Sequence, residues 1–189
     1  MTNKSPDNQG GDIWVFAYGS LMWHPNFEYE EKCRAHLNGY HRALCIYSVE
    51  YRGTAEKPGL VFGLDTGGSC KGMAFRVLGK NAQAIIDYLE NREMITNVYC
   101  PSWEPVELTS DDPDSPTHTK AYIFVADTTH AQYAGKLSDD EIVRLVNQGH
   151  GKTGPCIEYL QNTLDHLKEL GIEDPSLARI ITKTLSTES

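Results

Sequence analysis

The order of the predicted elements most constrains what this chain can fold into. Strand patterns fill the first two-thirds of the 189 residues, and helix patterns gather later. The strand patterns are short apolar or alternating segments separated by glycine-rich and proline-rich loops. They cover residues 13–17, 39–47, 60–64, 72–78 and 121–126, with a further extended segment at 98–108 that Pro101 and Pro105 interrupt. Gly67-Gly68 is a hairpin signal between the third and fourth of these strands.

The helix patterns are set by apolar spacing and by end signals. We expect helices over residues 81–94 and 139–148, the second opened by a capping box of Ser138 and Glu141 and stopped by Gly149. A third helix follows, and Asp174-Pro175 opens a short fourth one. The apolar side of the third helix holds Ile157, Leu160, Leu164 and Leu167. Short hairpins followed by segregated helices predict an α+β fold, in which a mainly antiparallel sheet is curved or closed into a barrel with flanking helices.

Length and composition suit one domain over residues 12–185 after a disordered leader at 1–11. The net charge of −9 and the absence of a basic run argue against nucleic acid. No apolar run is long enough to cross a membrane, and the polar leader does not read as a signal peptide. Five cysteines without a CxxC spacing indicate reduced, mostly buried thiols and a cytoplasmic location.

The first strand runs into the turn Tyr18-Gly19-Ser20-Leu21. A glycine turn at a strand end leaves backbone N–H groups without ladder partners, and successive N–H groups form a concavity suited to a carboxylate or an oxyanion. The turn is therefore a candidate for holding an anionic part of a small substrate. The alternative, which these residues alone favour, is an ordinary tight turn.

Glu93 is hard to explain as a structural residue. On an ideal helical wheel it falls about 20° from Ala82, inside the arc that holds Ile85, Ile86 and Leu89. A carboxylate centred on an apolar stripe is costly unless it is paired or partly neutral, and such placement gives a glutamate the pKa of a general base. The alternative is that the helix ends two residues earlier and Glu93 points to solvent.

Other chemistries leave weaker signals. The seven histidines form no HxxxH or HExxH pair, so no metal site is predicted. A Cys–His nucleophilic pair stays open, because such partners meet in space, but nothing local favours one cysteine. Gly149-x-Gly151-x-x-Gly154 imitates a dinucleotide loop, but no predicted strand precedes it.

Five ordered segments resemble the ChaC-type γ-glutamylcyclotransferases over roughly residues 12–181. They are Val15-Phe16-Ala17-Tyr18-Gly19-Ser20-Leu21-Met22-Trp23, Tyr51-Arg52-Gly53-Thr54-x-x-Lys57-Pro58-Gly59, Tyr88-Leu89-x-x-Arg92-Glu93-Met94, Gly149-x-Gly151-x-x-Gly154-Pro155 and Glu158-Tyr159-Leu160. Each segment alone is weak, but the ordered set is specific. Many eukaryotic members continue after the Arg-Glu pair with Lys-Gly-Gly-Tyr, whereas this chain has Met94-Ile95-Thr96-Asn97-Val98-Tyr99, closer to the bacterial type.

The resemblance implies a γ-glutamylcyclotransferase-like fold and a lyase-type enzyme that cleaves glutathione to 5-oxoproline and cysteinylglycine without cofactor or metal. Glu93 matches the family's catalytic glutamate. The family's loop for the γ-glutamyl end matches Val15, Phe16, Ala17, Tyr18, Gly19, Ser20 and Leu21.

Three further residues are weaker substrate-binding candidates. Arg52 lies in a glycine- and proline-rich loop, where a carboxylate clamp competes with an ordinary surface arginine. Tyr159 lies off the apolar stripe of its helix, so its position alone predicts an exposed tyrosine. Only the resemblance makes it a candidate for the site. Tyr99 is added as a further candidate.

The expected partner is a small molecule, glutathione or a related γ-glutamyl compound, with a monomer favoured. Two alternatives remain at this point. One is a cyclotransferase for other γ-glutamyl amines or peptides, and the other is a non-catalytic γ-glutamyl-binding module.

Overall fold

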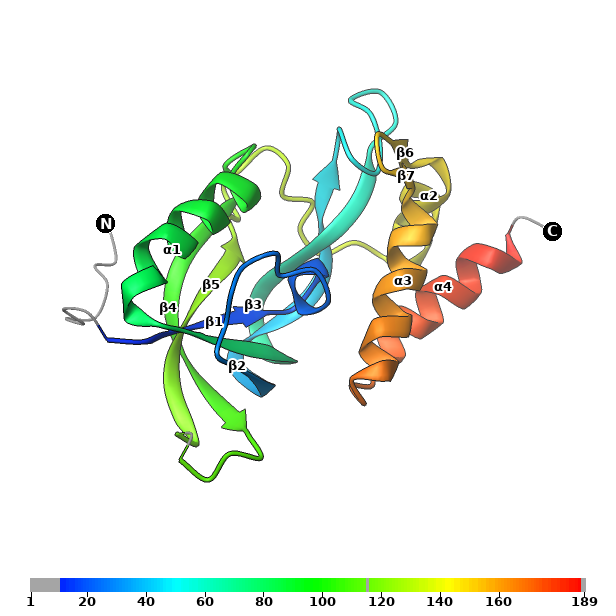
Figure 1. The fold of residues 1–189 in the computed structure, drawn as a ribbon. Coiled ribbons are helices and arrows are strands. Elements are labelled where there is room, and N and C mark those ends of the chain that lie inside the picture. The colour runs from blue at the N-terminus through cyan, green and yellow to red at the C-terminus, as the bar shows by residue number, and fades with distance from the viewer. Residues whose placement is uncertain (1–10, 115, 188–189) are drawn as a thin grey trace. The chain divides into compact units, whose positions relative to one another are not determined.

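A computed structural model describes residues 11–114 and 116–187 of the protein (Figure 1). The strands are β1 (Ile13–Ala17), β2 (Glu31–Ser48), β3 (Gly59–Val77), β4 (Tyr99–Thr109), β5 (His118–Ala126), β6 (His150–Gly151) and β7 (Gly154–Pro155). The helices are the short 3-10 helix η1 (Ser20–Met22), α1 (Gly79–Glu93), α2 (Asp139–Gln148), α3 (Cys156–Glu169) and α4 (Pro175–Ser186).

The larger strands close into a barrel in the order β1-β3-β2-β4-β5. β1 pairs antiparallel with β3, and β4 pairs antiparallel with both β2 and β5, whereas β1 and β5 are parallel. The predicted α+β class with a mainly antiparallel, barrel-like sheet is therefore confirmed. Pro101 and Pro105 are tolerated within β4 because the register with β2 covers only Val106–Thr109, so no ladder bond to β2 is lost at either proline.

The predicted hairpin at Gly67-Gly68 is wrong. Both glycines have positive φ values, 90° and 70°, as a hairpin turn would need, yet β3 continues through them as one strand of 19 residues. The neighbouring strand β2 holds the chain on its course, since Nδ1 of His41 lies 3.0 Å from the Gly67 carbonyl oxygen and Arg42 binds the Lys71 carbonyl. The strand predicted at residues 39–47 is also longer than expected, because β2 begins at Glu31.

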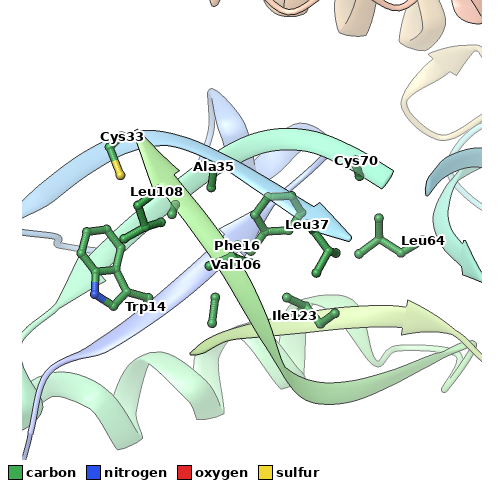
Figure 2. Close-up of a cluster of buried hydrophobic side chains, with 12 residues drawn as sticks. Trp14, Phe16, Cys33, Ala35, Leu37, Leu64, Cys70, Val106, Leu108 and Ile123 are labelled. Carbon is green, nitrogen blue, oxygen red and sulfur yellow. The ribbon is translucent and has the colours of Figure 1, made fainter. Parts of the chain in front are cut away.

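Apolar side chains fill the interior of the barrel (Figure 2). β1 contributes Trp14 and Phe16, which alternate with Ile13, Val15 and Ala17, and all five are buried. Since alternate residues of a strand point to opposite faces, β1 is covered on both sides. The interior cluster consists of Trp14, Phe16, Cys33, Ala35, Leu37, Leu64, Cys70, Ala74, Val106, Leu108, Ala121 and Ile123.

Aromatic side chains form a second layer outside β3. The ring of Phe75 makes edge contacts with Phe27 at 5.7 Å and with Tyr29 at 5.0 Å, and Phe27 also contacts Tyr88 of α1 at 6.4 Å. Tyr122 of β5 donates a 2.5 Å hydrogen bond to Glu90 in the last turns of α1. The ring of Phe27, which bridges Tyr88 and Phe75, and the bond from Tyr122 to Glu90 therefore hold α1 beside the barrel.

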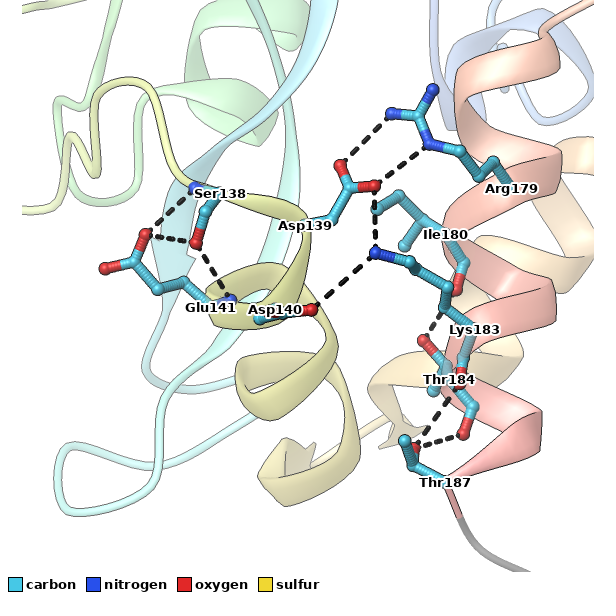
Figure 3. Close-up of polar contacts among 9 residues, drawn as sticks. All are labelled: Ser138, Asp139, Asp140, Glu141, Arg179, Ile180, Lys183, Thr184 and Thr187. Carbon is cyan, nitrogen blue, oxygen red and sulfur yellow. Dashed lines mark hydrogen bonds and ion pairs between the residues drawn. The ribbon is translucent and has the colours of Figure 1, made fainter.

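The helices α2, α3 and α4 pack against one another. The predicted capping box of α2 is present, since Ser138 accepts from the Glu141 backbone and the Glu141 carboxylate accepts from Ser138. Figure 3 shows that Asp139 also receives two hydrogen bonds from Arg179 of α4, at 3.0 and 3.1 Å. These bonds lower the pKa of Asp139 and tie the first turn of α2 to α4. Asp174 caps α4 as predicted, accepting from the Leu177 N–H.

Two glycine loops meet backbone to backbone beside these helices. A Cβ atom on Gly59 would lie 2.1 Å from the Arg52 carbonyl oxygen, and one on Gly151 would lie 2.5 Å from that of Glu50. Only glycine allows this approach. Gly149 follows α2 directly, which agrees with the absence of a strand before the dinucleotide-like pattern.

The structure divides into two compact units. Of the described residues, one unit comprises those up to Arg42 together with those from Leu64 to Asp127, and the other comprises Ala43–Gly63 and those from Thr128 onward. The barrel cluster, α1 and the turn after β1 belong to the first, and α2, α3 and α4 belong to the second. The single catalytic domain over residues 12–185 stays a prediction. The leader predicted at 1–11 lies outside the described residues except for Gly11.

Candidate active site

The turn after β1 uses its carbonyl groups and leaves amides unpaired. The carbonyl oxygen of Tyr18 accepts from Arg42 Nε at 2.7 Å, that of Gly19 from the Met22 N–H at 2.9 Å, and that of Ser20 from the His24 N–H at 2.9 Å. Among the described residues, no hydrogen bond uses the backbone N–H of Gly19, Ser20 or Leu21. The first N–H groups of a helix have no partner inside it, and here the short helix η1 begins at Ser20. The bond from the Met22 N–H to the Gly19 carbonyl is that of a tight turn, and such a turn leaves its central amides unpaired, so the anion-binding role of this turn stays a prediction.

The other predicted members of this stretch have buried side chains. Val15, Phe16 and Ala17 are each 1% exposed, and Leu21 is 8% exposed. Phe16 lies inside the barrel and Tyr18 packs against the same cluster while remaining half-buried. A molecule that approaches this stretch from solvent therefore meets chiefly the peptide groups of the turn and not the strand side chains.

Glu93 is the last residue of α1, so the alternative in which the helix ends earlier is wrong. Its side chain is only 23% exposed, and this burial raises the pKa of the carboxyl group. Arg92 opposes the shift, because its Nε lies 3.1 Å from the carboxylate and favours the charged form. Burial is the larger effect, so the pKa stays above the ordinary glutamate value.

Arg92 connects Glu93 to the turn after β1. Its Nη2 donates to the Ser20 hydroxyl at 3.2 Å, and its Nη1 donates to the His24 carbonyl at 2.8 Å and to the Tyr88 hydroxyl at 3.1 Å. The same guanidinium pairs with Glu93 through Nε. The structure therefore brings together Ser20 and Glu93, which are separated by 72 residues in sequence, through one side chain.

Arg92 was not among the predicted site residues, although it forms part of the quoted segment that ends in Glu93. On an ideal helical wheel Arg92 falls about 80° from Ala82, on the flank of the apolar arc, where a solvated charge is expected. The available signal was its spacing of four from Tyr88, which places the two side chains on one face of the helix. That signal does not reveal the acceptors in the Ser20–Pro25 segment, which are distant in sequence.

Tyr99 is the first residue of β4 and pairs with Ala126 of β5. Between it and Glu93 the chain makes a turn in which the Asn97 N–H donates to the Met94 carbonyl and Asn97 has a positive φ of 55°. Ile95 in this turn is 54% exposed. The side chain of Tyr99 is half-buried. Its role as a substrate contact stays a prediction.

Arg52 and Tyr159 lie together in the second unit. The Arg52 guanidinium stacks over the Tyr159 ring at 5.5 Å, and its Nη1 donates to the carbonyl oxygens of Thr153 and Pro155. Among the described residues, no hydrogen bond or ion pair uses Arg52 Nε or Nη2. The reading of Tyr159 as an exposed residue is wrong, because it is half-buried and its hydroxyl accepts from the Phe62 N–H at 3.4 Å.

The thiols of the described residues are free cysteines. Cys33, Cys45, Cys70 and Cys156 are buried and Cys100 is exposed, all as free thiols. Cys156 exchanges hydrogen bonds with the Leu60 backbone, and burial raises its pKa to about 11, so it is a poor nucleophile. Within residues 11–114 and 116–187, no three His, Cys, Asp or Glu side chains are grouped to hold a metal ion, and no helix is both long and apolar enough to span a membrane.

The fold is similar to that of a solved structure. The crystal structure of a γ-glutamyl cyclotransferase specific to glutathione from yeast matches 93% of this chain and 96% of its own chain with a TM-score of 0.82, at 20% sequence identity. The barrel with its flanking helices is therefore a γ-glutamylcyclotransferase-like fold.

The sequence then gives the family. The profile of the ChaC-like protein family matches residues 13–186, and the chain belongs to this family. The Escherichia coli K12 glutathione-specific γ-glutamylcyclotransferase is 35% identical over 167 residues, covering 88% of this chain and 70% of that protein. The Schizosaccharomyces pombe protein of the same name is 31% identical over 94% of this chain and 92% of its own length, and the human glutathione-specific γ-glutamylcyclotransferase 1 is 31% identical over 93% and 81%.

Proposed function

We propose that this protein is a γ-glutamylcyclotransferase that cleaves glutathione to 5-oxoproline and cysteinylglycine. Relatives named for this activity are 30–35% identical over most of the chain. The observation that carries the mechanism is the pairing, through Arg92, of a partly buried carboxylate with a turn whose amides are unpaired.

The reaction requires little from the protein beyond positioning and proton transfer. The α-amine of the γ-glutamyl group attacks its own γ-carbonyl carbon, a five-membered lactam closes, and the bond to the cysteine nitrogen breaks. Because the attack is intramolecular, an enzyme gains most by holding the flexible chain in the attacking pose. The α-amine must lose a proton before or during attack, and the leaving nitrogen must gain one.

Glu93 supplies the proton transfer in this proposal. Burial raises the pKa of its carboxyl group, which makes it a stronger base than an exposed glutamate. The carboxylate accepts the proton of the α-amine and then returns it to the leaving cysteine nitrogen. Arg92 holds it in place and opposes the rise in pKa, because its positive charge favours the charged form of the carboxyl group.

The amides of Gly19, Ser20 and Leu21 bind the developing oxyanion. The γ-carbonyl oxygen becomes negatively charged as the amine attacks, and donors that already point at its position stabilise this charge more than they stabilise the substrate. The carbonyls of the turn are held by Arg42 and by backbone N–H groups, so the amides are fixed before the substrate arrives. The strand segment Val15–Ala17 supports the turn from the core.

Arg52, Tyr159 and Tyr99 are each proposed separately as substrate contacts. The Nε and Nη2 groups of Arg52 offer two donors for a carboxylate, and stacking on Tyr159 holds the guanidinium plane. Tyr99 contributes a phenol at the start of β4. The proposal includes no cofactor or metal, a monomeric protein and a cytoplasmic location, the last supported by the free cysteines.

The test is a substrate panel with purified protein. Glutathione, γ-glutamyl-alanine and γ-glutamyl-lysine are incubated separately, and 5-oxoproline is measured by chromatography. We expect glutathione to give the highest kcat/KM. A higher value for another γ-glutamyl compound would replace the substrate in this proposal, and binding of glutathione without 5-oxoproline formation would make the protein a γ-glutamyl-binding module.

A further inference from the structure

The side chain of Arg42 ends at the turn that the proposed mechanism uses as its oxyanion site. Arg42 lies in β2, 24 positions from Tyr18, and is half-buried. Its Nε donates to the Tyr18 carbonyl at 2.7 Å, and its Nη2 donates to the Lys71 carbonyl of β3 at 2.8 Å. Two bonds from one rigid, planar fork fix the direction of the guanidinium as well as its position.

The bond to Tyr18 also sets the direction of the next amide. The Tyr18 carbonyl and the Gly19 N–H belong to one peptide group, which is planar and trans, so the two bonds point to opposite sides. There is no cis peptide bond among the described residues. With the carbonyl directed at Arg42, the Gly19 N–H is directed away from Arg42, and no described residue accepts it.

This peptide needs an external anchor. It lies after the last residue of β1, so the sheet no longer fixes it, and the glycine on its C-terminal side removes the steric limits that a side chain would impose. The next two carbonyls are held differently, because the N–H groups of Met22 and His24 reach them within the turn. Rotation of the Tyr18–Gly19 peptide would exchange an amide donor for a carbonyl oxygen, which repels an oxyanion.

The surrounding backbone supports Arg42 in this geometry. Gly72, next to Lys71, passes so close to β1 that a Cβ atom on it would lie 2.2 Å from the Ala17 carbonyl oxygen. The end of β1 and the Lys71 carbonyl are therefore held near each other by the sheet. A positive charge on the carbonyl side of the Tyr18–Gly19 peptide also polarises its N–H and strengthens it as a donor.

We propose that Arg42 is a positioning residue that fixes the Gly19 N–H as an oxyanion donor by anchoring the Tyr18–Gly19 peptide. This role rests on the proposed cyclotransferase function. Arg42 itself does not touch the substrate. Its effect falls on the transition state, because the negative charge that the amide stabilises develops only during attack.

The kinetic test compares Arg42→Gln with Arg34→Gln. Arg34 is exposed on the same strand and serves as the matched control. Loss of a whole oxyanion donor costs about 10²–10³ in kcat. Since the peptide of the variant still samples the active orientation, we expect kcat to fall about 10- to 100-fold with KM changed less than about threefold. Arg34→Gln should keep both constants, and Arg42→Lys, which retains one donor to Tyr18, should recover part of kcat.

A crystal structure of Arg42→Gln gives a readout that does not depend on activity. We expect the Tyr18–Gly19 peptide to be rotated or present in two orientations. If the wild-type protein does not turn over glutathione, the proposed function is wrong. The anchoring role of Arg42 is still tested in that case, by comparing the orientation of the Tyr18–Gly19 peptide in the wild-type and variant structures. If Arg42→Gln does not fold, Arg42→Lys is examined by the same two methods.

Three results would overturn the inference. The first is an unchanged peptide orientation in the variant, and the second is an unchanged kcat. The third is a variant with a lower melting temperature and a smaller fraction of active enzyme but an unchanged kcat per active site. That result would make Arg42 a purely structural residue.

Discussion

Replacing Arg92 with methionine removes the charged group that joins Glu93 to the turn after β1 while keeping an apolar stem. The lost contacts include hydrogen bonds to His24, Tyr88 and Ser20 at 2.8, 3.1 and 3.2 Å and the ion pair with Glu93 at 3.1 Å. Bonds to a charged group contribute about 1.5–3 kcal/mol each in favourable cases. The Arg92 side chain is 23% exposed and water can replace it at some acceptors, so we expect a net loss of about 2–4 kcal/mol.

For a protein of this size, that loss corresponds to a fall in melting temperature of about 5–15 °C. Arg144→Met on α2 is the matched control, because Arg144 is exposed and bonds Gln148 within its own helix. Calorimetry of the two variants at one pH gives the comparison. A melting temperature for Arg92→Met equal to that of the control would refute the bridging role assigned to Arg92.

The same variant changes the pH dependence of activity in a predictable direction. Burial raises the pKa of Glu93 and Arg92 lowers it, so removal of Arg92 leaves the raising effect unopposed. A base acts in its charged form, so activity is lost as the pH falls through this pKa. The acid limb of the kcat/KM profile should therefore move to higher pH in Arg92→Met and stay in place in Arg144→Met. An acid limb that moves to lower pH would contradict the assignment of Glu93 as the base.

Three further predictions use other parts of the chain. Arg52→Lys should raise KM for glutathione about 5- to 10-fold with kcat nearly unchanged, because a compact ammonium cannot reproduce a forked carboxylate contact; equal initial-rate constants would refute the clamp. Gly59→Ala should destabilise the protein by more than about 3 kcal/mol in urea, because its Cβ atom would lie 2.1 Å from the Arg52 carbonyl, whereas Gly39→Ala, with nothing within 4 Å, should lose only the about 1–2 kcal/mol of its positive φ. Thiol titration of the native protein should modify Cys100 and leave Cys156 unmodified until the protein unfolds, and native modification of Cys156 would contradict its burial.

Features encoded within a few residues were predictable from the sequence. Three such features are the apolar run of β1, the capping box of α2 and the Asp174 cap of α4. Each depends only on residues close to one another in the sequence. The α+β class followed from the order of such local signals. The extra length of β2 and β3 was not predictable from the sequence. It depends on which residues of neighbouring strands pair with each other, and the sequence does not show this register.

Two glycine signals illustrate the difference. Gly67-Gly68 adopts the positive φ values of a turn, but β2 holds the chain extended, so a correct local conformation led to a wrong hairpin. The turn at Gly19 was interpreted as a tight turn or an anion site, and nothing in the sequence indicated that Arg42, from a distant part of the chain, binds the Tyr18 carbonyl. In both cases the deciding contact comes from another strand.

The candidate base shows a similar limit. The helical wheel left Glu93 between a buried and an exposed position, because the end of α1 could not be set to within two residues. The resemblance to a known family favoured the buried reading, and the structure supports it with a side chain that is 23% exposed. The contacts of Arg92 could not be predicted, since its acceptors at Ser20 and His24 lie more than 60 residues away.

The most direct test of the central claim compares Glu93→Gln with Glu28→Gln, an exposed glutamate of the same unit, at saturating glutathione. Removal of a general base reduces turnover by about 10²–10⁴. We expect Glu93→Gln to lose 5-oxoproline formation by at least this factor while binding glutathione with an affinity close to wild type in calorimetry, and Glu28→Gln to remain fully active. A folded Glu93→Gln variant that retains more than about a tenth of the wild-type rate would contradict the assignment of Glu93 as the acid–base residue.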